Sequence, residues 1–182
     1  MSKLYYKYGT MGAAKTAEAL ICKFRYEETG QNVLLLKPDK ATRDGNYTVK
    51  SRIGLSAAAT SLTEFLVGDY IAEAKFYSVI ILDECQFATE KEIDLLAEIA
   101  DRTDTPVICY GLKTDRRRKL FEGSKRLLEI ADSISEIKSV CECGRKAIFN
   151  IKLSGDDING KYASCCRRCA DKYKNKGQGR EK

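Results

Sequence analysis

The chain has 182 residues and a formal net charge of +6, with 43% hydrophobic and 32% charged residues. This length fits one mid-sized domain with a small appendage. No stretch reaches the roughly eighteen apolar residues that a membrane span needs, and no signal peptide opens the chain. We therefore expect a cytoplasmic protein without a membrane partner. The positive charges are dispersed and not interleaved with aromatic residues, so we expect no nucleic-acid partner either.

The first strand and helix enclose a candidate phosphate-binding loop. Leu4–Tyr8 is strand-like, and 17–28 has helical spacing that Gly30 closes. The residues between them nearly match the Walker A loop G-x-x-x-x-G-K-[ST], with Ala14 in place of the second glycine. The backbone amides of such a loop cradle a triphosphate, its lysine reaches the β- and γ-phosphates, and its last hydroxyl binds Mg²⁺. The predicted phosphate-binding residues are Gly9, Thr10, Met11, Gly12, Ala13, Ala14, Lys15 and Thr16. The alternative is a turn of small residues that only joins the strand to the helix.

A pair of acidic residues, Asp83 and Glu84, directly follows the buried strand predicted over 78–82. Carboxylates at the C-terminal end of a strand lie where open α/β sheets bind ligands. Asp83 is the candidate Walker B ligand of Mg²⁺, together with Thr16. The chain has no histidine, so a proton acceptor near neutral pH must be another group, and Glu84 is the candidate. The alternative is a solvated cap at the end of the strand.

The remaining periodic segments alternate between strand and helix. Further strands are predicted over 33–36 and 106–110, and helices over 63–75, 91–101 and 125–131. This alternation predicts a parallel sheet with crossover helices. The regularity fails after Asp132, and we place a domain boundary near Ser139. The predicted units are a nucleotide-binding domain over 1–139, a small subdomain over 140–173 and a disordered polar tail over 174–182.

Cysteines crowd the small subdomain, which also holds a strand predicted over 147–153. Two pairs of cysteines form candidate metal-binding turns, Cys141 with Cys143 and Cys166 with Cys169. Two such turns assemble the four-thiolate site of a zinc ribbon, and a reducing compartment disfavours disulfides. Cys165 is the spare thiol, because only Cys166 gives the two-residue spacing to Cys169. Redox-active or incidental cysteines are the alternative.

Taken together, these motifs resemble the type II thymidine kinases in content, order and spacing. The residues that carry the resemblance are the loop at 9–16, Lys37-Pro38, Thr42-Arg43-Asp44, Ser51-Arg52-Ile53-Gly54, Asp83-Glu84-Cys85-Gln86-Phe87, Tyr110-Gly111-Leu112-Lys113-Thr114-Asp115, Leu120-Phe121-Glu122-Gly123-Ser124 and the two cysteine turns. The resemblance implies a RecA-like α/β domain with a P-loop and a zinc-binding subdomain that carries a lasso loop. It also implies a homotetramer that is inhibited by its triphosphate end product.

The resemblance further implies transfer of the ATP γ-phosphoryl group to the 5′-hydroxyl of thymidine in nucleotide salvage. Glu84 would accept the proton of that hydroxyl. Gln86 and Arg43 would join the ATP-binding residues, and Arg52 would pair with phosphate or orient an acid. The implied nucleoside-binding residues are Met11, Phe87, Leu112, Phe121, Asp157, Ile158, Asn159, Gly160 and Tyr162. Without the resemblance, Met11, Leu112 and Phe121 would be assigned to the core.

Three departures from the family pattern bear on substrate choice and activity. Ala14 replaces a glycine, Arg116 stands where the family carries an aromatic residue, and the segment 153–162 is shorter than a usual lasso. These departures leave three outcomes open for the protein: it accepts deoxyuridine as well, it turns over only weakly, or it binds nucleotides without turnover. Two other classes stay open. ATP hydrolysis without a nucleoside would indicate a P-loop ATPase in which Glu84 activates water, and salt-dependent binding to DNA would indicate a zinc-ribbon nucleic-acid binder.

Overall fold

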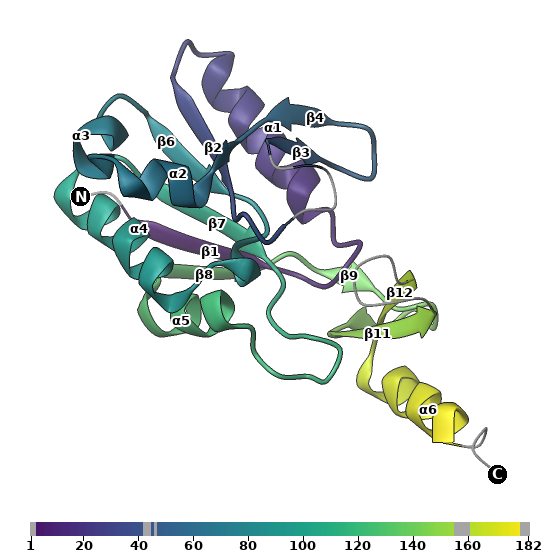
Figure 1. The fold of residues 1–182 in the computed structure, drawn as a ribbon. Helices are drawn as coiled ribbons and strands as arrows, with labels where there is room; N and C mark the ends of the chain where they lie inside the picture. The colour runs from purple at the N-terminus through teal and green to yellow at the C-terminus, as the bar shows by residue number, and fades with distance from the viewer. Residues whose placement is uncertain (1–2, 42–44, 46, 155–160, 179–182) are drawn as a thin grey trace.

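The structure, a computed structural model, describes residues 3–41, 45, 47–154 and 161–178, with side-chain surroundings up to residue 173. In these ranges a central sheet has six parallel strands in the order β5-β2-β6-β7-β1-β8 (Figure 1). The strands are β1 (Leu4–Tyr8), β2 (Val33–Lys37), β5 (Thr60–Ser61), β6 (Val79–Leu82), β7 (Val107–Gly111) and β8 (Ser133–Glu136). The expected α/β fold with a parallel sheet is confirmed.

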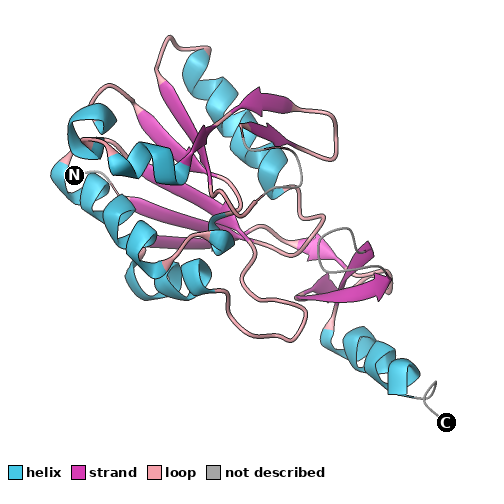
Figure 2. Cartoon of the chain, in the orientation of Figure 1, coloured by secondary structure: helices cyan, strands magenta, loops and turns pink. Residues whose placement is uncertain are grey.

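Helices cover both faces of this sheet (Figure 2). They are α1 (Lys15–Glu27), α2 (Leu62–Val67), α3 (Tyr70–Ala74), the short 3₁₀ helix η1 (Cys85–Phe87), α4 (Glu90–Arg102) and α5 (Glu122–Ile130). Alternate residues of one strand enter two different cores. Ile80 and Leu82 of β6 pack with α2, α4 and α5, whereas Val79 and Ile81 pack with α1. Burial on both faces is why the central strands are continuous apolar runs.

The helix predicted over 63–75 is two helices in the structure. Gly68 ends α2 in an extended conformation, and the side chain of Asp69 accepts a hydrogen bond from the Ala72 N–H at 3.1 Å. An aspartate in this position caps the start of a new helix. The apolar spacing of the segment survives the break, so periodicity alone predicted one continuous helix.

Several other elements were absent from the sequence prediction, including an edge strand and a hairpin. The edge strand β8 is short and half exposed, and it is held by parallel pairing with β1. The strands β3 (Thr48–Lys50) and β4 (Ser56–Ala58) form an antiparallel hairpin beside α1. Both elements are too short and too polar to show a clear period-2 pattern.

The C-terminal part contains two small antiparallel pairs and one helix. They are β9 (Ser139–Val140) with β10 (Lys146–Ala147), β11 (Phe149–Ser154) with β12 (Lys161–Cys165), and α6 (Arg167–Gln178). The tail was expected to be disordered from residue 174, whereas α6 continues to Gln178. Burial of Cys169 and Ala170 anchors the first turn of this helix, from which it continues. Residues 179–182 lie outside the described ranges. No helix in the described part of the chain is long and apolar enough to cross a membrane.

Candidate active site

The loop between β1 and α1 contains two residues in the left-handed conformation. Gly12 has a φ of 76°, and Ala14, which directly precedes α1, has a φ of 61°. A left-handed conformation costs an L-residue about 1–2 kcal/mol, whereas glycine adopts it freely. The departure from the motif at position 14 is therefore a strained residue within an otherwise regular phosphate loop.

Lys15 begins α1 and is only 9% exposed. Its Nζ donates a hydrogen bond to the Thr10 carbonyl at 2.9 Å, across the base of the loop. Burial lowers the pKa of Lys15, while the nearby carboxylates of Glu84 and Asp83 oppose this shift. The ammonium group and the free amides at the start of α1 together provide a site for an anion.

Asp83 follows β6 and is 3% exposed. Burial raises the pKa of its carboxyl to about 7, the charge of Glu84 adds to the shift, and a hydrogen bond from the Thr16 side chain opposes it. Its Oδ1 is enclosed and has no hydrogen-bond partner among the described residues. Carboxylate and hydroxyl oxygens suit Mg²⁺, so Asp83 and Thr16 fit the predicted cation site.

Glu84 lies next to this pair in a left-handed conformation, with a φ of 54°. Gln86 Nε2 donates to Glu84 Oε2 at 2.5 Å, and Gln86 Oε1 accepts from the Leu112 N–H at 3.0 Å. The buried amide of Gln86 thus links the carboxylate to the end of β7. Gln86 was expected to bind ATP, which stays a prediction; in this structure both ends of its amide bond protein groups, one of them Glu84.

The phosphate loop and Glu84 meet at one cleft of about 650 Å³, whereas Asp83 is buried and does not line it. Lys15 and Glu84 both line this first cleft, which lies at the edge of the sheet where parallel strands present their C-terminal ends. The predicted residues that line it are Met11, Gly12, Ala14, Lys15, Thr16, Arg52, Glu84 and Leu112. Lys50, the last residue of β3, and Ser51 and Ile53, which follow it, also line this cleft. Only the family resemblance pointed to Ser51 and Ile53, and nothing in the sequence pointed to Lys50.

A second cleft of about 770 Å³ adjoins the first, and Met11 and Leu112 line both. Its aromatic wall contains Phe87 and Phe121, whose ring centroids lie 5.8 Å apart at an interplanar angle of 72°. Tyr162 and Arg116 line it too. All five nucleoside-binding candidates in the described ranges therefore surround one cavity. Arg43 and the other four candidates, Asp157, Ile158, Asn159 and Gly160, lie outside the described residues.

Sequence reasoning missed Asn150, a residue of the second cleft. Its Oδ1 accepts a hydrogen bond from the backbone N–H of Met11 at 2.8 Å. Asn150 lies in β11, within the strand predicted over 147–153, but no spacing or motif could have related it to a loop 139 positions earlier.

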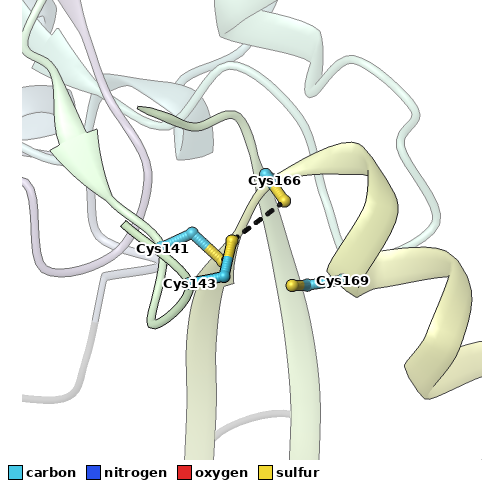
Figure 3. A group of neighbouring side chains, drawn as sticks. All are labelled: Cys141, Cys143, Cys166 and Cys169. Atoms are coloured by element: carbon cyan, nitrogen blue, oxygen red, sulfur yellow. Dashed lines mark hydrogen bonds between the residues drawn. The ribbon is translucent and has the colours of Figure 1, made fainter. Parts of the chain in front are cut away.

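The four predicted zinc ligands form one cluster (Figure 3). The sulfurs of Cys141, Cys143, Cys166 and Cys169 lie within 4.8 Å of one another. The Cys143 sulfur is 3.6 Å from those of both Cys141 and Cys166. A tetrahedral zinc ion with Zn–S bonds of about 2.3 Å separates its ligand sulfurs by about 3.8 Å, so the cluster fits structural zinc. Cys165 is buried and is not part of the cluster.

Comparisons with known proteins agree with this geometry. The family model described as thymidine kinase matches residues 2–170. The chain is 39% identical to the thymidine kinase of Vibrio cholerae, covering 92% of this chain and 96% of the relative. It is 40% identical to that of Zymomonas mobilis and 39% identical to that of Enterobacteria phage T4, each covering 92% of this chain and 95% of the relative. A crystal structure of a DNA replication initiation factor aligns with a TM-score of 0.46 and 16% identity over 74% of this chain and 40% of the other, too weak a likeness to argue from.

The parallel sheet, the phosphate loop and the acidic doublet that follows β6 define a P-loop nucleotide-binding protein. The family match specifies which kind. The chain belongs to the thymidine kinase family, and it is an enzyme that phosphorylates thymidine, a small-molecule nucleoside.

Proposed function

We propose that the enzyme transfers the γ-phosphoryl group of ATP to the 5′-hydroxyl of thymidine, and also of deoxyuridine, in nucleotide salvage. The observation that carries this proposal is the junction of the two clefts. Lys15 and Glu84 line the first cleft, aromatic side chains line the second, and Met11 and Leu112 belong to both. A triphosphate in the first cleft and a nucleoside in the second would meet beside Glu84.

Positioning and charge neutralisation supply most of the acceleration in phosphoryl transfer. Lys15 and the loop amides would hold the phosphates, and Arg52, which lines the first cleft, would pair with the transferred group. Asp83 and Thr16 would hold Mg²⁺, which neutralises charge on the phosphates when it is bound. Glu84, oriented by Gln86, would accept the proton of the nucleoside hydroxyl.

The second cleft has the composition that a small flat base requires. Phe87, Phe121 and Leu112 provide apolar walls, and Tyr162 and Asn150 add polar groups. Arg116, which stands where the family carries an aromatic residue, also lines this cleft and makes its wall more polar. We further propose a homotetramer that is inhibited by its triphosphate end product, and a zinc-binding subdomain that begins after Ser139.

A direct assay tests the reaction. The purified protein is incubated with γ-labelled ATP and Mg²⁺ and with thymidine, deoxyuridine, deoxycytidine or deoxyguanosine in turn. We expect labelled thymidine and deoxyuridine monophosphates, and little release of phosphate when no nucleoside is present. Steady hydrolysis of ATP without a nucleoside would instead indicate an ATPase. Binding of ATP without any product would indicate a nucleotide-binding protein that has lost turnover.

A further inference from the structure

Two neighbouring side chains of the β11–β12 hairpin hold the backbone of Met11 in the phosphate loop. The Asn150 side-chain oxygen accepts from the Met11 N–H at 2.8 Å, and the Ser164 hydroxyl donates to the Met11 carbonyl. Asn150 and Ser164 are paired across the hairpin, so the two bonds come from one rigid position. Both backbone polar groups of Met11 are thereby satisfied by a part of the chain about 140 residues away.

This contact fixes a residue on which the shape of the phosphate loop depends. Met11 follows Thr10, whose carbonyl accepts the hydrogen bond of Lys15, and precedes the left-handed Gly12. A loop that is already held in its bound conformation binds its ligand with a smaller entropic penalty. The hairpin therefore supports phosphate binding without lying in the phosphate site.

The bond to Met11 also sets the orientation of the Asn150 amide. Because the backbone N–H is a donor, the side-chain oxygen must face it, and the Nδ2 group faces the other way. No described residue accepts a hydrogen bond from Nδ2, and this nitrogen is not among the enclosed polar atoms that lack a partner. Asn150 itself is 5% exposed; it lines the second cleft and also borders a smaller cavity beside Gly9 and Glu136. Its hydrogen-bond donor therefore borders the second cleft and this smaller cavity, and the second cleft is the one with the apolar walls that a base requires.

We propose that Asn150 is both a positioning residue for the phosphate loop and a specificity-determining residue for the base. Its Oδ1 holds Met11, and its Nδ2 donates to a carbonyl oxygen of the nucleoside base in the second cleft. A fixed donor favours a ring carbonyl, such as either of those in thymine, and disfavours an amino group at the same place. The second role rests on the proposed nucleoside function, whereas the first does not.

Two variants separate the roles. Asn150→Leu removes the acceptor and the donor at similar volume. Ser164→Ala removes the other bond to Met11, and Ser164 does not line the second cleft. Binding of Mg²⁺ with a non-hydrolysable ATP analogue, measured by calorimetry without nucleoside, tests the loop. We expect both variants to bind the analogue about threefold to tenfold more weakly, since each loses one partly buried hydrogen bond to the loop.

Binding of thymidine, 2-thiothymidine and 4-thiothymidine tests the base, because a thiocarbonyl is a weak acceptor. The original protein should bind one thio analogue about fivefold or more weakly than thymidine. Ser164→Ala should keep the same ratio of affinities for thymidine and for the thio analogue. In Asn150→Leu the two affinities should differ by no more than about twofold. A merely structural role for Asn150 would not change the ratio. Asn150→Ala serves in place of the leucine variant if the latter does not fold, as judged by thermal unfolding and zinc content.

Each half of the proposal has its own contrary result. Unchanged affinity for the ATP analogue in both variants would overturn the role of Asn150 in the loop. Equal binding of the three nucleosides by the original protein, or a ratio that survives Asn150→Leu, would overturn the base contact. Failure of the proposed function itself would appear differently, as absence of a labelled monophosphate in the turnover assay, and the ATP-analogue measurement would still test the loop.

Discussion

Ala14 is the residue at which the phosphate loop departs from its motif, and its φ of 61° shows why glycine suits this position. The side chain of Ala14 is exposed at the first cleft, so the strain is not offset by burial of its methyl group. Strained backbone at a ligand site persists because the surrounding structure holds it.

Ala14→Gly should therefore stabilise the protein. Relief of the left-handed conformation outweighs the extra chain entropy of glycine in the unfolded state, so we expect the free energy of unfolding to rise by about 0.5–1 kcal/mol. Urea unfolding without nucleotide measures it. Ala13→Gly is the matched control, because Ala13 is buried and has no positive φ; this variant should lose stability. A fall in stability for Ala14→Gly would contradict the interpretation.

Glu84→Gln should nearly abolish turnover. Loss of a positioned base typically lowers the rate by about 10²–10⁴-fold, while binding of the ATP analogue should persist because Lys15 and the loop amides are untouched. Steady-state phosphorylation of thymidine, alongside calorimetry, measures both effects. Glu90→Gln makes the same charge change in the exposed first turn of α4 and should keep full activity. Retention of the rate in Glu84→Gln would exclude Glu84 as the base.

At the scale of elements, α5 packs closely against η1, the short helix that carries Gln86. The contact is at Gly123, near the start of α5, where an added Cβ would lie 2.4 Å from the Cys85 carbonyl oxygen and 2.7 Å from that of Ala88. Backbone atoms cannot rotate away as a flexible side chain can. The helix can therefore approach the site only with glycine at this position.

Gly123→Ala should separate α5 from η1. We expect a loss of about 1–3 kcal/mol in the free energy of unfolding, typical of overpacking, together with slower phosphorylation because η1 carries Gln86. Denaturant unfolding and the kinase assay measure these effects. Gly68→Ala is the control, since the nearest atom to its added Cβ is 4.0 Å away and its φ is not positive. Equal behaviour of the two variants would show that the close approach at Gly123 is not limiting.

The elements also show which parts of the fold a sequence can predict. Long apolar runs such as 78–82 and strongly periodic helices such as 91–101 were predicted within a few residues of β6 and α4. The edge strand β8 was not, because pairing with the distant β1 stabilises it more than its own residues do. The β3–β4 hairpin was not either, because its two three-residue strands are too short to show a pattern. The cysteine cluster was predictable because its ligands come in two short turns.

At the scale of the whole molecule, the segment that carries the cysteine cluster contacts the larger α/β part in two places. Its bonds to Met11 reach the phosphate loop, and Asp171 of α6 pairs with Arg118, which follows β7, at 2.7 Å. The guanidinium of Arg118 also lies 4.4 Å from the centre of the Phe149 ring. Contacts of this kind join residues that are far apart in sequence, which is why Asn150 escaped prediction while the loop it holds did not.

Loss of the metal should consequently weaken nucleotide binding. Cys166 follows β12 and lies two residues after Ser164, so Cys166→Ser should release zinc and loosen the hold on Met11. We expect less than a tenth of the original zinc content and a several-fold weaker affinity for the ATP analogue. Metal analysis and calorimetry test this. Cys165→Ser, next to the cluster but outside it, should keep about one zinc per chain. Full zinc content in Cys166→Ser would contradict the ligand assignment.

The shared wall of the two clefts has a consequence for redesign. Met11 and Leu112 border both cavities, whereas Ile53 borders only the first and Phe121 only the second. A larger side chain at position 11 or 112 would change the preference for the phosphate donor and for the nucleoside acceptor together. Substitutions at 121 and its neighbours would change the preference for the nucleoside alone, and substitutions at 53 would change the preference for the phosphate donor alone.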